Sequence, residues 1–259
     1  MAKILFNEAT KEFHLQNDRI SYIFCIMENG QLGHQYFGRH LTHRDSFQHF
    51  IQMRTQSHTA YVYEDDFLFT LDTIRQEYPS YGTTDFREPA YQIKQENGSR
   101  ITEFVYKNHE IYKGKKKLEG LPASFGTEEE VETLDLILKD PILGLKVILS
   151  YSIFEKEDII ARSVRLINEG SEMLKVEKVY SACVDMDNED FEMLSLHGSW
   201  ARERHIQTRQ LAYGKQLVSS FRGESSHQEH PFIALLTPGT SQKSGKVYGM
   251  HFVYSGNFV

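Results

Sequence analysis

The sequence is poor in several residue types that mark well-known protein classes. Its 259 residues include two cysteines, six prolines and one tryptophan, and its formal net charge is −7. Two cysteines, Cys25 and Cys183, are too few for a disulfide framework, which favours a reducing, cytoplasmic compartment. The negative charge argues against nucleic acid as a partner, because phosphate binding needs a cationic face.

Long apolar runs are missing as well. The N-terminal stretch meets Asn7, Glu8 and Lys11 before it reaches the length of a signal peptide. No later window approaches the roughly 18 uncharged apolar residues of a membrane span. We therefore expect no export signal, no contact with a membrane and a cytoplasmic protein.

Common catalytic and metal motifs are also absent. No GxSxG, Walker or GxGxxG motif follows a predicted strand. The histidine pairs His40 with His43 and His227 with His230 have two residues between them, but no cysteine pair or HExxH motif completes a ligand set. We interpret them as surface or hydrogen-bonding histidines and expect no metal and no cofactor.

The residues that are present predict an all-β fold. Leu134, Leu136 and Leu138 alternate with polar residues, and the runs 145–154 and 160–168 continue a β-meander. Asn29-Gly30 predicts a two-residue hairpin turn. Closely spaced turn residues favour a sandwich over a sheet with crossover helices.

Two segments interrupt the strand pattern. Between residues 40 and 59, Phe47, Phe50, Ile51 and Arg54 recur at helical spacing behind a possible Ser46 cap, which predicts a short helix. Residues 72–89 predict a long ordered loop, because the aromatic side chains there would be costly to leave in water: Tyr78, Tyr81 and Phe86.

Acidic clusters and the single tryptophan are the candidate site residues. Glu64-Asp65-Asp66 and the run 185–190 follow predicted strands, where carboxylates commonly face water. Trp200 lies in a polar stretch, His197–Arg204, in which arginines and a carboxylate could bind sugar hydroxyls while the indole stacks on a sugar ring. Core packing and a ligand or subunit contact are both open for Trp200.

An ordered set of sequence blocks resembles bacterial α-galactosidases of glycoside hydrolase family 36. The blocks span nearly the whole chain and are Gln76–Arg87 (QEYPSYGTTDFR), Tyr112–Lys115, Leu121–Ala123, Gly198–Arg204, Ser225–Gln228 with Pro231-Phe232, and Phe252–Phe258. The resemblance implies one N-terminal domain over residues 1–259, a large twisted β-sandwich of the galactose-mutarotase-like supersandwich type. A catalytic (β/α)₈ barrel would follow residue 259 and is absent from this chain.

The resemblance also implies a role without catalysis. Family members carry their aspartate nucleophile in a lysine-tryptophan-aspartate motif, whereas the only tryptophan here stands between Ser199 and Ala201. The catalytic residues are thus expected outside this chain. The complete enzyme would be a tetrameric, retaining hydrolase of terminal α-galactosyl groups in melibiose- and raffinose-type sugars, and this fragment alone would be inactive.

Trp200 matches a family tryptophan that contacts substrate. Some relatives also offer an aspartate before the QEYP block, but the comparable stretch here is Gln52-Met53-Arg54, so Asp65 or Asp66 would have to substitute. The alternative hypotheses are a free-standing carbohydrate-binding module and an oligomerisation module.

Overall fold

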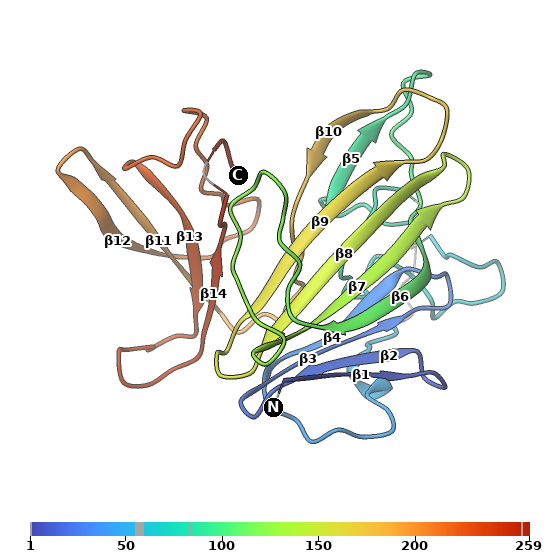
Figure 1. The fold of residues 1–259 in the computed structure, drawn as a ribbon, viewed down its shortest axis with the longest axis horizontal. Helices are drawn as coiled ribbons and strands as arrows, with labels where there is room; N and C mark the ends of the chain where they lie inside the picture. Colours follow the sequence, from blue (N-terminus) through green and yellow to red (C-terminus); the bar gives the residue numbers. More distant parts are fainter. Residues whose placement is uncertain (1, 55–59, 83, 255) are drawn as a thin grey trace. The chain divides into compact units, whose positions relative to one another are not determined.

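The computed structural model describes the chain except for residues 1, 55–59, 83 and 255. Contacts divide it into unit 1 (residues 1–116 and 126–186) and unit 2 (residues 117–125 and 187–259). Strands make up both units, and among the described residues the only helical element is a 3₁₀ turn, η1 (Gln48–Phe50) (Figure 1). The all-β class is confirmed, while one domain over 1–259 stays a prediction.

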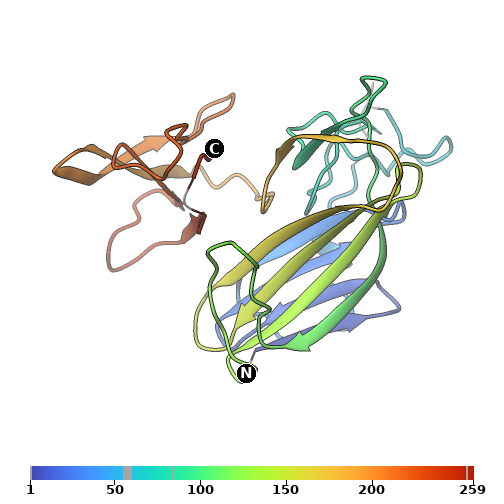
Figure 2. The ribbon, with the colours of Figure 1, turned by 45° about the horizontal axis from the view of Figure 1, so that its top comes forward.

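Unit 1 contains two four-stranded antiparallel sheets. The first is formed in chain order by β1 (Lys3–Asn7), β2 (Glu12–Gln16), β3 (Ile20–Ile26) and β4 (Leu32–Arg39). The second is the predicted meander, formed by β6 (Val105–Lys113), β7 (Val131–Asp140), β8 (Leu145–Phe154) and β9 (Ile160–Asn168). A two-stranded ribbon joins β5 (Tyr91–Lys94) to β10 (Lys175–Val179). Figure 2 shows the two larger sheets as stacked layers.

The main core lies between these two sheets. Leu134, Leu136 and Leu138 are buried on one face of β7, as their alternation predicts. From the opposite sheet the Phe24 ring stacks on Tyr151, with 5.2 Å between ring centroids. Full burial of one such side chain contributes about 1.5–3 kcal/mol, so this apolar layer holds the sandwich together.

The hairpin between β3 and β4 is confirmed, although its loop is one residue longer than predicted. Met27 and Gln31 close the loop through a backbone hydrogen bond of 2.8 Å, and Gly30 donates to the Met27 carbonyl oxygen at 2.9 Å. Gly30 has φ +80°, which is the left-handed conformation of a three-residue hairpin loop. Asn-Gly therefore located the turn correctly but not its length.

The predicted helix within residues 40–59 is wrong in extent. The structure has only η1, which begins after Phe47 rather than after a Ser46 cap, and residues 55–59 lie outside the described residues. The Phe47 N–H donates to the buried Glu12 carboxylate at 2.9 Å, and Arg75 donates to the Phe50 carbonyl oxygen at 2.8 Å. A longer helix would pair the Phe50 carbonyl oxygen internally, so the Arg75 bond occupies an acceptor that continuation of the helix needs. The Phe47 N–H would belong to the first turn, where N–H groups have no partner within the helix.

The ordered loop at residues 72–89 is only partly buried. Tyr78 is buried and stacks on Tyr91 with 5.4 Å between centroids, as expected. Tyr81 and Phe86 are 46% and 68% exposed, so the prediction that all three aromatic rings would be covered is wrong within this chain.

Unit 2 is a single four-stranded antiparallel sheet with a small core. Its strands are β11 (Glu192–Ser199), β12 (Arg202–Gln210), β13 (Glu229–Leu236) and β14 (Val247–His251), in the order β12-β11-β13-β14. The buried cluster consists of Met193, Val218 and Phe258. β12 is an edge strand, and all of its residues are exposed.

Candidate functional site

Trp200 lies at the turn between β11 and β12. Its side chain is 84% exposed, which rules out the core-packing alternative for the described part of the chain. An indole of this exposure leaves a large apolar face in water, a feature typical of residues that meet a ligand or another surface. The geometry of the turn decides where this face is held.

Three features fix the turn around Trp200. A Cβ on Gly198 would lie 2.1 Å from the Arg202 carbonyl oxygen, so the strands approach too closely there for any other residue. Ala201 has φ +61°, and its N–H donates to the Glu203 carboxylate at 2.9 Å. Arg202 Nε donates to Ser199 Oγ at 3.2 Å.

The turn end of the same hairpin is joined to β13 and to the loop before it. The Gly198 N–H donates to the Gln228 carbonyl oxygen at 3.2 Å, and Arg222 donates to the Gln228 side chain at 2.7 Å. His197 Nδ1 lies 2.8 Å from a Glu229 carboxylate oxygen, and its Nε2 lies 2.6 Å from Ser195 Oγ. Two sequence blocks, Gly198–Arg204 and Ser225–Gln228, therefore meet in one structural site.

The turn presents an aromatic face beside charged groups. Arg202, Glu203 and Arg204, which begin two residues after Trp200, are exposed on β12. Such a set can stack on a sugar ring and exchange hydrogen bonds with its hydroxyls. Because Trp200 projects from the end of a hairpin, these residues form one wall, and a pocket for a ligand would need further walls from another element.

The two other candidate residues lie in unit 1. Asp66 accepts hydrogen bonds from the N–H groups of Leu68 (2.8 Å) and Phe69 (3.2 Å), so its carboxylate stabilises a local turn. Asp65 is exposed. Of the 52–66 segment, residues 55–59 lie outside the described residues. A sugar contact by Asp65 or Asp66 stays a prediction.

The QEYP block has a structural role that the sequence did not reveal. Glu77 is fully buried and accepts hydrogen bonds from Tyr22 and Tyr151, each at 2.8 Å, and from His34 Nδ1 at 2.5 Å. Arg162 lies 3.4 Å away. Burial would raise the pKa of Glu77, but the Arg162 charge and these hydrogen bonds outweigh burial and lower it.

A second polar network joins residues 76–87 to the acidic run 185–190. Arg87 contacts Asp185 at 2.5 Å and Asp85 at 2.9 Å, and the Gln76 N–H donates to Asp185 at 2.9 Å. In unit 2, Glu189 pairs with Lys246 at 2.6 Å. The interpretation of this run as solvated carboxylates is thus wrong for the part-buried Asp185, whereas Glu189 is exposed and its ion pair lies at the surface. No sequence spacing could have predicted partners so far apart along the chain.

The histidine pairs do not form a metal site in the described residues. No group of three or more potential ligands comes together there. His43 Nδ1 instead lies 3.1 Å from Nδ1 of the buried His14, and the His230 ring lies 5.7 Å from that of His251. Within the same residues, no helix is long and apolar enough to cross a membrane.

Comparison with known proteins gives a consistent result. The N-terminal domain of glycosyl hydrolase family 36 matches residues 30–259. α-Galactosidase AgaA of Geobacillus stearothermophilus is 44% identical over 99% of this chain and 35% of its own length. The crystal structure of the Lactobacillus brevis α-galactosidase superposes with a TM-score of 0.94 at 40% identity, covering 98% of this chain and 34% of that one.

A variant of AgaA has also been solved in complex with raffinose. It is 44% identical to this chain, with a TM-score of 0.91 over 95% of this chain and 34% of that one. The chain therefore belongs to glycosyl hydrolase family 36, as the N-terminal domain of that family. It spans about a third of the length of the curated relatives it matches.

Proposed function

We propose that this chain is the accessory domain of a retaining α-galactosidase that hydrolyses terminal α-D-galactosyl residues in melibiose- and raffinose-type sugars. Family membership supports the reaction class, and relatives of this family are named α-galactosidases. The observation that carries the proposed role is the exposed Trp200 at a rigid turn. The domain provides one wall of the sugar pocket and contacts between subunits.

The catalytic carboxylates belong to a (β/α)₈ barrel that follows residue 259. A retaining glycosidase needs two carboxyl groups about 5 Å apart, one as nucleophile and one as acid and base. Three carboxylates of this chain are engaged in structural bonds: Glu77 in the core, Asp66 in a turn and Glu203 at the Trp200 turn. Their engagement supports the proposal that this chain alone has no galactosidase activity.

The complete enzyme works in the cytoplasm as a tetramer, with residues 1–259 acting as one domain against the barrel. The free thiols of Cys25 and Cys183 support a reducing compartment. The fully exposed edge strand β12 supports a subunit contact, because an unpaired strand edge invites pairing or coverage. The same observation favours the second candidate function, an oligomerisation module.

Replacing Trp200 tests the proposal in the complete enzyme. Because the indole contributes stacking on the sugar, Trp200→Ala should raise KM for raffinose about tenfold or more, equivalent to about 1.4 kcal/mol, while Trp200→Phe recovers part of the loss. Tyr213→Ala is the matched control, since Tyr213 is another exposed aromatic residue of unit 2.

The result also separates the alternatives. If Trp200→Ala leaves KM and kcat unchanged but lowers the particle mass measured by light scattering, Trp200 serves oligomerisation and not the sugar pocket. Raffinose binding to the isolated chain in calorimetry, lost in Trp200→Ala, would support a free-standing carbohydrate-binding module instead.

A further inference from the structure

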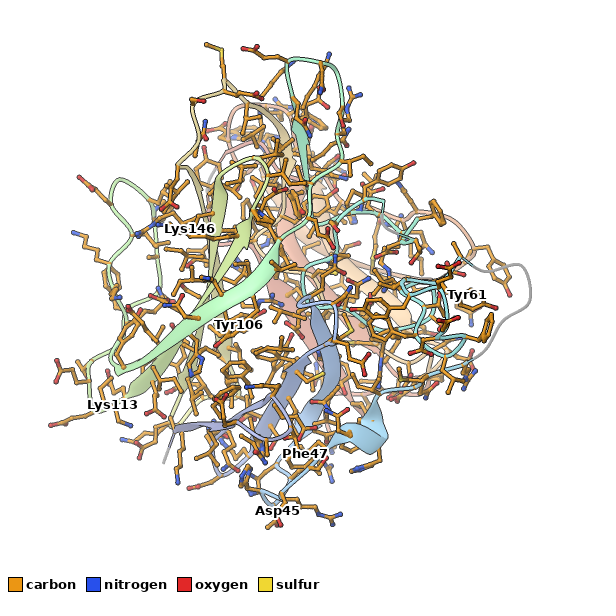
Figure 3. The ribbon with its side chains drawn as sticks, turned by 90° about the vertical axis from the view of Figure 1, so that its right-hand side faces the viewer. Asp45, Phe47, Tyr61, Tyr106, Lys113 and Lys146 are labelled. Carbon is orange, nitrogen blue, oxygen red and sulfur yellow. The ribbon has the colours of Figure 1, made fainter. Side chains whose placement is uncertain are left out.

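A cavity in unit 1 is unrelated to the Trp200 turn. It is a half-open hollow of about 470 Å³ at the 40–50 segment, next to η1. Its polar lining includes His40, Arg44 and His49, and its aromatic lining is Phe47 and Phe50. In Figure 3, Phe47 lies close to the first sheet of unit 1, and Asp45 marks the outer edge of the same segment. We refer to this feature as the 40–50 cavity.

The walls of the 40–50 cavity are held by bonds to the neighbouring strands. The Leu41 N–H donates to Ser21 Oγ on β3 at 2.9 Å, and the Phe47 N–H donates to Glu12 on β2 at 2.9 Å. The Phe50 ring stacks on Tyr36 of β4 with 5.4 Å between centroids. A cavity built on fixed strands loses little conformational entropy when a ligand enters.

Arg44 is the one charged residue among those that line the cavity, beside the imidazoles of His40 and His49. Arg44 forms no ion pair with any described residue, and no described acidic side chain lines the cavity. The buried Glu12 carboxylate, which accepts from the Phe47 N–H of the cavity wall, also accepts hydrogen bonds from Gln35 Nε2 at 2.7 Å and Thr10 Oγ1 at 2.8 Å, so its oxygens are already engaged. A single exposed arginine is ordinary. An arginine and two imidazoles that line one cavity offer several hydrogen-bond donors to the same ligand.

We propose that the 40–50 cavity binds a phosphate group, either as inorganic phosphate or as a phosphate monoester. The planar guanidinium of Arg44 matches two phosphate oxygens, and ring N–H groups of His40 and His49 supply further donors. The Phe50 side would accept the apolar part of an ester. The site is independent of the proposed sugar wall, so either assignment can fail without the other.

Calorimetric titration of the intact protein with inorganic phosphate tests the assignment. Saturable binding should weaken at least tenfold in Arg44→Gln and stay unchanged in Arg165→Gln, which removes the same charge from an exposed position on β9. Circular dichroism verifies that both variants are folded, as expected for exposed side chains. Raffinose hydrolysis should be the same in Arg44→Gln and in the parent.

Further ligands identify the source of the phosphate group. Tighter binding of galactose 1-phosphate than of inorganic phosphate, again lost in Arg44→Gln, assigns the site to a monoester; equal affinity assigns it to free phosphate. Galactose itself should not compete. Equal losses in Arg44→Gln and Arg165→Gln would reduce the effect to general charge attraction and overturn the proposal, as would the absence of saturable binding.

Discussion

Among single residues, Glu77 is the one whose surroundings are most tightly specified. It is completely buried, and its carboxylate connects Tyr22 and His34 of the first sheet to Tyr151 and Arg162 of the second. A buried ion pair adds little net stability when both charges are present, but removal of one partner leaves the other uncompensated. The network therefore acts chiefly as a constraint on how the two sheets meet.

Glu77→Gln should therefore destabilise unit 1 strongly. The uncompensated Arg162 charge in the core predicts a loss of about 3–5 kcal/mol in the free energy of unfolding, measured by urea denaturation. Glu169→Gln is the control, because Glu169 pairs with Lys139 and Lys146 at the surface and should matter little. A loss no larger than that of the control would contradict the assigned role of Glu77.

At the scale of elements, the 40–50 segment shows how tertiary bonds override local pattern. Its apolar residues have helical spacing, yet Arg75 donates to the Phe50 carbonyl oxygen that a longer helix would use, and only η1 is helical. The β-meander, by contrast, was predictable, because alternation alone assigns a face to each residue of β7 and β8. Local periodicity thus predicts strands in a sandwich better than it predicts segments that side chains from elsewhere hold in place.

The strand β2, whose His14 contacts His43 of this segment, should respond to acid. Burial, with contributions from His43 and His40, lowers the pKa of His14 from 6.5 to about 4. Between these values the unfolded chain binds a proton at His14 that the folded chain does not. The free energy of unfolding should therefore fall, by about 1–3 kcal/mol, as pH decreases from 6.5 to 4.

Urea denaturation at several pH values measures this slope. His14→Gln should flatten it, since glutamine can keep a hydrogen bond but does not titrate. An equal slope in His14→Gln and the parent would assign the acid sensitivity to other groups.

On the scale of the whole molecule, the two units have unequal cores. Unit 1 buries an extensive cluster between its sheets, whereas the buried cluster of unit 2 is limited to Met193, Val218 and Phe258. Fold class and family were predictable from alternation and ordered blocks. The division into two units could not be predicted in the same way. It depends on the number of apolar contacts that each stretch makes in the fold, and the spacing of residues in the sequence does not give this number.

We expect the isolated chain to unfold in two steps, with unit 2 first. Its smaller core supplies less hydrophobic stabilisation, and Trp200 lies in this unit. The far-ultraviolet circular dichroism, to which the strands of both units contribute, should therefore show two transitions in urea, the smaller one at the lower urea concentration. Coincident transitions would instead support a single cooperative domain over residues 1–259.

Unit 2 is discontinuous along the chain, since residues 117–125 belong to it although they connect β6 and β7 of unit 1. A truncated chain that ends at residue 186 would keep this connecting segment but lose the rest of unit 2, against which it packs. Conversely, grafting unit 2 onto a related enzyme would require transplanting two separate stretches together. Recombination between family members should therefore tolerate crossovers inside the β7–β9 meander poorly and exchanges that carry both stretches best.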